Sequence, residues 1–378
     1  MTMVTFSRLN KSAIANWWWT VDKITLALLM LTIFIGAFLV FSASPAVART
    51  NHFSDYHFIK KQVVFILIAL VILFSVSMLR LKNIRRLSIV LYLLFFVLTF
   101  ITLFAGYSTK GSSRWIRLLG FTLQPSEFLK PTFAVVSAWL LDGSKKSADF
   151  PGSLFSIGLY ALTIAMLLAQ PDFGMTIVVS VIWGFQLFLA GLPMTIVFVL
   201  GVLGLLGSIG VYFTLPHVHE RVHQFWFSGG ELGYQVKKSL EAFENGNLLG
   251  RGPGEGTVKL HLPDAHTDFI FAVAGEEFGV WLCLLIVVLF AAVVVRTMRL
   301  SLGEKNLFIS YASSGLAALF GLQSIINMAS TLHLIPTKGM TLPFISYGGS
   351  SLFASALGMG MLLALTRRNL AAQDKDIV

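Results

Sequence analysis

Ten apolar stretches, each about as long as a membrane-spanning helix, dominate this sequence of 378 residues. A helix needs about 20 mostly apolar residues to cross the hydrocarbon core of a bilayer. Because 56% of the chain is hydrophobic and only 12% is charged, the composition excludes a soluble globular protein. We expect an all-α integral membrane protein with about ten transmembrane helices, which cover residues 24–44, 62–79, 87–106, 126–142, 153–170, 174–191, 193–214, 268–295, 307–332 and 350–366.

The distribution of Lys and Arg residues predicts the side of the membrane on which each connection lies. An even number of spans places both termini on the same side, and 15 of the 28 Lys and Arg residues fall there. Twelve fall on the opposite side, but five of these belong to the long polar segment 215–267, and the positive-inside rule discounts long loops. We therefore expect both termini in the cytoplasm and one large extracytoplasmic loop at about 215–267.

The chain has no internal repeat and no low-complexity tract. Residues 1–378 are therefore expected to form a single polytopic membrane domain. The net charge of +10 indicates anchoring at the cytoplasmic membrane face, an anionic ligand, or both. We expect membrane lipids and no nucleic acid among the partners.

Two charged residues enter the predicted span 126–142. Glu127 and Lys130 stand three positions apart and therefore share one face of a helix. Ionisable residues inside a membrane usually face a cavity or a substrate path. A mutual ion pair would explain them equally well, so the residues alone leave both interpretations open.

The segment 334–351, LIPTKGMTLPFISYGGSS, breaks the apolar pattern with two prolines and three glycines. Non-helical backbone at membrane depth is tolerated only where it is buried in protein or lines a wet cavity. Lys338 supplies a cation and Ser346 a hydroxyl in this segment, and Arg114 in SSRWI supplies a second cation suited to a membrane interface. All three fall on the extracytoplasmic side of the predicted topology.

Asp268 stands at the mouth of the apolar stretch 268–295, in the sequence HTDFIF. Burying a carboxylate is costly, so this residue needs a partner or a function. A helix N-terminus favours negative charge, and this would explain Asp268 without any chemistry. A catalytic or metal-binding role is the alternative.

The sequence HERVH (219–223) matches the H-E-x-x-H pattern of zinc metalloproteases. An intramembrane protease would also need an aspartate ligand, and the nearest candidate is Asp142 in LDG. In the predicted topology Asp142 and His219 lie at opposite faces of the membrane, about 30 Å apart. We therefore interpret this segment as a basic interfacial turn. The glycine-rich GRGPGEG (250–256) lacks the G-K-[ST] of a nucleotide-binding P-loop and is interpreted as a tight turn.

Several motifs together resemble the SEDS family (shape, elongation, division and sporulation). They follow the family's order and spacing over nearly the whole chain. PTKG at 336–339 resembles the cell-division branch rather than the elongation branch. The motifs read SSRWI…GFTLQPSEFLKP, QPDFG, YQVKKSLEAFENGNLLGRGPGEG, LPDAHTDFIFAVAGEEFG, INM and PTKGMTLPFISYGGSS.

This resemblance implies a membrane glycosyltransferase that polymerises lipid II into peptidoglycan strands during cell division. It implies a multi-pass protein of the bacterial inner membrane at the division septum, with a class B penicillin-binding protein and other division proteins as partners. A lipid II flippase, an elongation-type polymerase and a purely structural scaffold are the alternatives.

The same resemblance implies that Asp268 is the catalytic residue. We expect Arg114, Glu127, Lys130, Lys338 and Ser346 to bind the substrate. Asp268 can act as a general base, or it can hold a divalent cation such as Mg²⁺ or Mn²⁺ that clamps pyrophosphate oxygens. The sequence does not choose between these roles, and no cofactor is certain.

Overall fold

A computed structural model of the protein describes residues 12–50, 52–109, 112–118, 121–147, 149–214, 216–227, 230–336 and 339–367. The first half contains α1 (Ala13–Thr20), α2 (Lys23–Thr50), α3 (His57–Ser77), α4 (Leu81–Ala105), β1 (Tyr107–Thr109), β2 (Ser112–Leu118), β3 (Phe121–Leu123), α5 (Pro125–Lys146), α6 (Gly152–Ala169) and α7 (Phe173–Leu189). The second half contains α8 (Met194–Thr214), α9 (Pro216–Phe227), α10 (Gly230–Gly246), the short 3₁₀ turn η1 (Val258–Leu260), α11 (Ile270–Leu302), α12 (Leu307–Thr331) and α13 (Gly349–Leu365).

Each of the ten predicted spans coincides with a long helix. Six of the described helices are long and apolar enough to cross a membrane, namely α2, α3, α4, α6, α11 and α12. The helices α7 and α13 are shorter, and α5 carries charged residues at both ends. The membrane class is therefore confirmed, while the number of ten crossings and the placement of both termini in the cytoplasm stay predictions.

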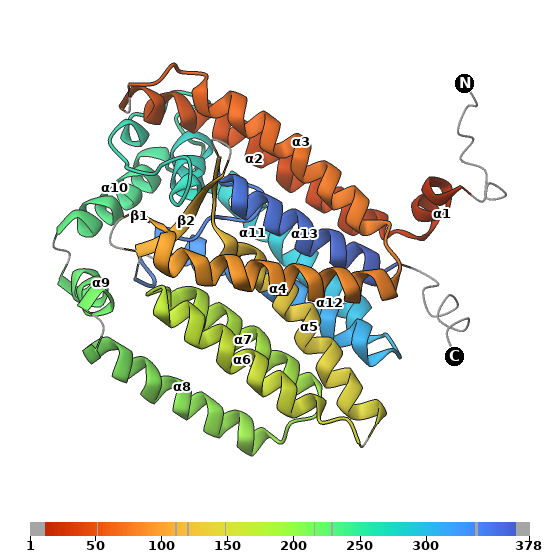
Figure 1. Cartoon of the computed structure of the whole chain (residues 1–378). Helices are drawn as coiled ribbons and strands as arrows, with labels where there is room; N and C mark the ends of the chain where they lie inside the picture. Colours follow the sequence, from red (N-terminus) through yellow and green to blue (C-terminus); the bar gives the residue numbers. More distant parts are fainter. Residues whose placement is uncertain are drawn as a thin grey trace.

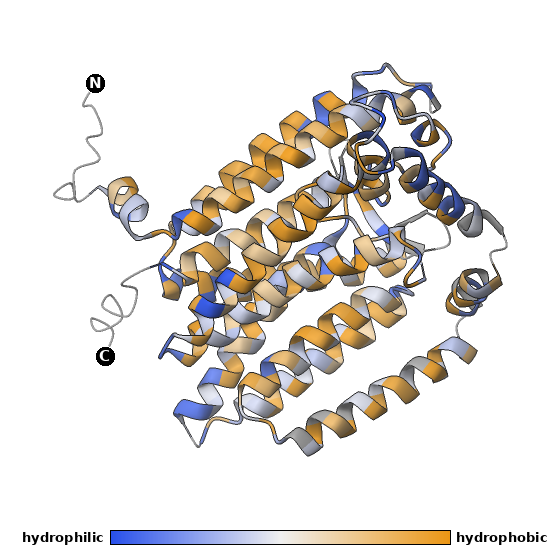
Figure 2. Cartoon of the chain, turned by 180° about the vertical axis from the view of Figure 1, so that it is seen from behind, coloured by the Kyte–Doolittle hydropathy of each residue, from blue (hydrophilic) through white to orange (hydrophobic). Residues whose placement is uncertain are grey.

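The long helices form a bundle with two distinct ends (Figure 1). The β-strands and α10 lie at one end, here called the sheet end, and α1 lies at the other. Hydrophobic residues cover the sides of the helices, and hydrophilic residues gather toward the two ends (Figure 2). Side chains such as Phe34, Val71 and Phe104 are more than 60% exposed on the outside of the bundle, as lipid-facing residues are.

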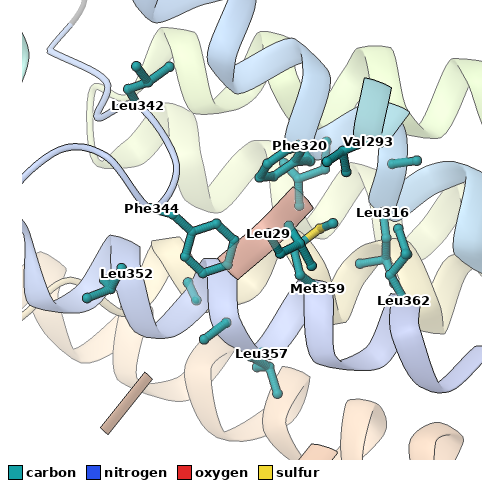
Figure 3. Close-up of a cluster of buried hydrophobic side chains, with 14 of the residues drawn as sticks. Leu29, Val293, Leu316, Phe320, Leu342, Phe344, Leu352, Leu357, Met359 and Leu362 are labelled. Carbon is teal, nitrogen blue, oxygen red and sulfur yellow. The ribbon is translucent and has the colours of Figure 1, made fainter. Parts of the chain in front are cut away.

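The most buried helices, α5, α12 and α13, form the centre of the bundle. In α5 nearly every residue from Pro125 to Asp142 is buried, and α12 and α13 are buried along most of their lengths. Phe344 comes from the segment between α12 and α13 and inserts into this core beside Phe320 and Leu29 (Figure 3). The part of the predicted break from Met340 to Ser346 is thus largely buried in protein, as non-helical backbone at membrane depth requires.

A small antiparallel sheet accompanies the helices, and the predicted all-α class is confirmed because helices make up nearly all of the regular structure. Three strands follow α4 in the order β1-β2-β3, with Ile116 opposite Leu123 and Arg117 opposite Thr122. The sheet connects the end of α4 to the start of α5. Its two ladders pair backbone groups within one short stretch of chain.

The part of the predicted loop from α10 onward is folded onto α11. The helix α11 is interrupted at Gly279, whose φ of 71° is left-handed, so the carbonyl oxygens of Glu276 and Glu277 are free to accept other donors. The backbone N–H groups of Arg251 and Gly252 donate to them, both at 2.9 Å. The glycine-rich segment 250–256 is the expected turn, since Gly250, Gly252 and Gly254 all have positive φ.

A buried carboxylate completes this attachment. The Glu276 side chain, with no solvent exposure, accepts bonds from the backbone N–H groups of Thr257, Val258 and Lys259 at 2.7, 2.7 and 3.0 Å. Glu277 pairs with the buried Lys259 ammonium group. The two acids thereby hold the stretch that leads into Asp268.

Candidate active site

Asp268 lies in a tight turn just before α11. The prediction that the helix starts at residue 268 is wrong, because α11 begins at Ile270. The backbone N–H groups of Thr267 and Phe269 both donate to the Asp264 carbonyl oxygen, at 3.0 and 3.3 Å, and Asp264 itself has a φ of 55°. The half-buried Asp268 is therefore presented by a turn rather than by a regular helix.

Three consecutive carbonyl oxygens of this turn are each bound by a different donor. The Tyr347 N–H donates to His266 O at 2.8 Å, and the Ser346 hydroxyl donates to Thr267 O at 2.5 Å. The Asn327 amide donates to Asp268 O at 2.8 Å. The backbone around the carboxylate is therefore held by contacts from two other parts of the chain.

The segment after Lys338 passes directly beside the Asp268 carboxylate. Gly339 has a φ of 63°, and a Cβ atom at this position would lie 3.1 Å from Asp268 Oδ2. The left-handed backbone favours glycine here, and an added side chain would also crowd the carboxylate. Lys338, predicted to bind substrate, lies outside the described residues, but its neighbour Gly339 lies beside the candidate catalytic group.

Ser346 has a different position from the one expected of a substrate-binding residue. Its hydroxyl donates to Thr267 O and accepts the Leu342 N–H at 2.8 Å. The hydroxyl hydrogen is therefore used within the protein, and the side chain is almost completely buried. The geometry favours a role in holding the Asp268 turn over direct contact with a ligand.

Arg114 extends from β2 to the turn between α6 and α7. Its guanidinium group donates to Gln170 O at 3.2 Å and Pro171 O at 2.6 Å, and pairs with Asp172 at 3.2 Å. Asp172 also accepts the Met175 N–H and so caps α7. Arg114 thus stabilises a turn at the sheet end. Its remaining guanidinium N–H groups could donate to a substrate.

Glu127 and Lys130 form the expected ion pair, with Lys130 Nζ 2.8 Å from Glu127 Oε2. Both side chains are buried. They also line a cavity between α5, α12 and α13 of about 20 Å³, measured as space for the centre of a water molecule, which is enough for one water. Gln323 and Ser355 are the other polar residues in its wall. The ion-pair interpretation and the cavity interpretation are therefore compatible, because Glu127 and Lys130 neutralise each other and also face a cavity.

The cavity is close to the Asp268 turn along α12. Gln323 in the cavity wall and Asn327 at the Asp268 turn are four residues apart on this helix, which corresponds to about 6 Å along its axis. Ser350 at the start of α13 accepts the Gln124 N–H at 3.0 Å, just before α5 begins. The structure thus brings the predicted residues of α5 and the Asp268 turn into one region at the sheet end.

Two residues of this region were not predicted. Asn327 lies within the INM motif and His266 within HTD, yet the residues alone indicated no role for either. The His266 ring packs between Phe58 and Tyr347, with centroid distances of 4.8 and 4.9 Å. Burial lowers the pKa of His266 to about 4, so the imidazole is neutral near pH 7 and serves as a packing element of the turn.

Metal ligands are sparse in the part of the chain that the structure describes. It contains no group of three or more His, Cys, Asp or Glu side chains arranged to hold a metal ion. The rings of His219 and His223 stack 6.2 Å apart on α9, without the further ligand that the zinc-protease interpretation needs. A divalent cation at Asp268 would therefore need most of its ligands from a bound pyrophosphate and water.

Comparison with known proteins identifies the family. A family model described as a cell cycle protein, FtsW/RodA/SpoVE, matches residues 22–370. The chain belongs to this family. The resemblance inferred from the sequence motifs is thereby confirmed.

Members of the FtsW/RodA/SpoVE family resemble the chain over almost all of its length. The probable peptidoglycan glycosyltransferase FtsW of Caulobacter vibrioides is 40% identical over 364 residues, which cover 96% of this chain and 93% of that protein. The protein of the same name from Geobacter sulfurreducens is 33% identical over 92% of this chain and 96% of its own length. The stage V sporulation protein E of Bacillus subtilis is 31% identical, with coverage of 92% and 97%.

Solved structures of the family share the fold. One chain from a peptidoglycan synthase complex, reported as "Structural coordination of polymerization and crosslinking by a peptidoglycan synthase complex", superposes with a TM-score of 0.78 at 27% identity. The match covers 92% of this chain and 98% of that one. The rod shape determining protein RodA of Thermus thermophilus matches with a TM-score of 0.66 at 24% identity, over 94% and 98% of the two chains.

Proposed function

We propose that this chain is a peptidoglycan glycosyltransferase that polymerises lipid II into glycan strands during cell division. Family membership and the FtsW names of relatives at up to 40% identity support this activity. The observation that carries the proposal within the chain is the half-buried carboxylate of Asp268, held in a turn whose three carbonyl oxygens are all bound. Such a rigid mounting suits a group that must meet a substrate atom accurately.

The reaction needs little more than one carboxylate. A sugar hydroxyl of the acceptor attacks the anomeric carbon of the lipid-linked donor, and the bond from that carbon to the pyrophosphate oxygen breaks. The pyrophosphate leaves with the bonding electron pair, while the hydroxyl proton passes to Asp268. Because pyrophosphate is already a good leaving group, it needs charge neutralisation more than protonation.

Cations at the sheet end would supply that neutralisation. We propose that Lys338, next to Gly339, and the remaining donors of Arg114 bind the pyrophosphate. A divalent cation held by Asp268 and the pyrophosphate oxygens would serve the same purpose. We expect the donor and acceptor lipids to enter laterally from the membrane, since both carry long hydrocarbon tails.

The partner is proposed to be a class B penicillin-binding protein at the division septum of the inner membrane. A related chain has been solved in a complex that couples polymerisation with crosslinking. The segment 215–267 is proposed as the surface for coupling, because its part from α10 onward is folded onto α11 and leads directly into Asp268.

A bound partner is expected to raise the polymerisation rate by fixing the segment that presents Asp268. The rate should be measured with labelled lipid II at equal amounts of chain, with and without the penicillin-binding protein. An unchanged rate, under conditions where the complex demonstrably forms, would contradict activation through this surface.

The proposed activity itself is tested with purified chain, partner and labelled lipid II. We expect glycan strands of many disaccharide units, with one intact lipid pyrophosphate released from the donor at each addition and the acceptor's lipid kept on the strand. A flippase would instead move lipid II between leaflets and leave its length unchanged. Translocation without polymer, in vesicles containing the folded complex, would overturn the proposal.

A further inference from the structure

The side chain of Asn327 bridges two segments that meet at the candidate active site. It lies on α12 and has no solvent exposure. Its amide nitrogen donates to Asp268 O at 2.8 Å and to Met340 O at 2.6 Å. Both amide hydrogens are therefore used, and each binds a backbone carbonyl of a different segment.

The orientation of this amide follows from its surroundings. If the amide were flipped, Asn327 Oδ1 would face two carbonyl oxygens and repel both. In the orientation that donates, Oδ1 has no hydrogen-bond partner among the described residues. The bridge therefore requires the donating orientation, in which each amide hydrogen is bound to a backbone carbonyl oxygen.

Asn327 also differs from the other residues that hold the Asp268 turn. Ser346 and Tyr347, which bind the two preceding carbonyl oxygens, belong to the same irregular segment as Met340. Without a contact from elsewhere, the turn and this segment could shift together. Asn327 comes from a buried helix that also carries Gln323 of the cavity wall, and it therefore fixes both segments relative to the centre of the bundle.

We propose that Asn327 is a positioning residue for glycosyl transfer: it sets the place of Asp268 relative to Gly339 and the cavity, and it acts only through Asp268. The inference rests on the proposed catalytic role of Asp268. Loss of the bridge lets the turn and the 339–347 segment shift together relative to α12, so the carboxylate is misplaced relative to the cavity. A misplacement of about 1 Å can reduce a rate by about 100-fold.

The test compares Asn327→Leu and Asn327→Ser with the unaltered chain, each in complex with the partner. Leucine keeps the approximate volume but has no donor, and serine is too short to reach both carbonyl oxygens. We expect kcat to fall about 100-fold at saturating lipid II while KM changes by less than about threefold. The melting temperature and the fraction bound to partner are measured on the same samples.

Two further variants make the result specific. Ser324→Ala removes a buried hydroxyl from α12. Among the described residues this hydroxyl donates only to Phe320 O and Gly321 O, so the variant should leave kcat unchanged. Asp268→Asn shows whether the carboxylate itself is needed. Assays are repeated well below the melting temperature, where a merely unstable variant would regain its rate.

The outcomes separate the two proposals. A low kcat in folded Asn327 variants, together with an inactive Asp268→Asn and an active Ser324→Ala, supports positioning. If Asn327→Ser keeps a kcat per folded molecule within about twofold of the unaltered chain while Asp268→Asn is inactive, the positioning role of Asn327 is overturned. The catalytic role of Asp268 is then unaffected. An active Asp268→Asn overturns the catalytic assignment and with it this inference.

Discussion

Replacing Asp268 by asparagine should leave a folded, partner-binding protein that no longer polymerises lipid II. Asparagine keeps the shape and much of the hydrogen bonding, and the backbone contacts to Tyr347, Ser346 and Asn327 do not depend on the side chain. The charge and the basicity are lost. Removal of a general base lowers a reaction rate by about 10²–10⁴-fold. We therefore expect the polymerisation rate, measured as polymer formed per folded molecule, to fall by at least about 100-fold.

Asp264→Asn is a matched control for this change. Asp264 lies four positions earlier in the same turn, and its positive φ is one that asparagine adopts readily. Asp264→Asn removes the same charge as Asp268→Asn, but Asp264 has no proposed catalytic role. This variant should therefore retain polymerisation. Equal losses in both variants would show that the turn tolerates no amide, and would remove the special role of Asp268.

The metal-ligand role makes an additional prediction. If Asp268 holds a divalent cation, chelation of Mg²⁺ and Mn²⁺ should reduce the unaltered chain to the level of Asp268→Asn. Added cation should then restore the unaltered chain and not the variant. Full activity in the presence of chelator would leave the general-base role as the explanation.

Breaking the Glu127–Lys130 pair at one side should be strongly destabilising. Removing one partner of a buried ion pair leaves an uncompensated charge and typically costs about 3–5 kcal/mol. Glu127→Gln and Lys130→Met should therefore each lower the melting temperature. The double variant should regain most of the stability, because no unpaired charge remains.

Polymerisation should not recover in the double variant. The pair lines the cavity together with Gln323 and Ser355. Gln323 lies one helical turn along α12 from Asn327, the residue that bridges to Asp268. We expect the rate to stay at least about tenfold low, which corresponds to about 1.4 kcal/mol of lost transition-state stabilisation. A double variant with both stability and activity restored would mark the pair as a structural brace.

The Asp142–Lys146 pair provides the control on the same helix. It lies at the other end of α5, with Lys146 Nζ 2.8 Å from Asp142 Oδ2, and it is not among the residues of the cavity wall. Asp142→Asn/Lys146→Met should therefore retain polymerisation. A rate as low as that of the Glu127/Lys130 double variant would point to a general effect of charge removal from α5.

The features that the sequence predicted correctly are those set by local spacing. Hydrophobic length placed a helix at each expected span, because a membrane segment must satisfy its backbone internally. Glu127 and Lys130 are three residues apart, so the periodicity of one helix was sufficient to pair them.

The features that escaped prediction depend on contacts between distant parts of the chain. Arg114 pairs with Asp172, 58 positions later, and nothing in SSRWI indicates that partner. The start of α11 is shifted by the turn that Asn327, Ser346 and Tyr347 hold from elsewhere. The resemblance implied a substrate-binding role for Ser346, which stays a prediction, and its hydrogen bond to Thr267 O could not be read from the sequence.

The most direct measurement follows glycan length and transbilayer movement together in proteoliposomes that contain labelled lipid II and the partner. The unaltered chain and Asp268→Asn are compared at equal amounts of folded protein. We predict long glycan strands from the unaltered chain, none from the variant, and the same rate of lipid movement with both. Glycan of near-normal length from folded Asp268→Asn would contradict the central claim that this carboxylate carries the polymerisation.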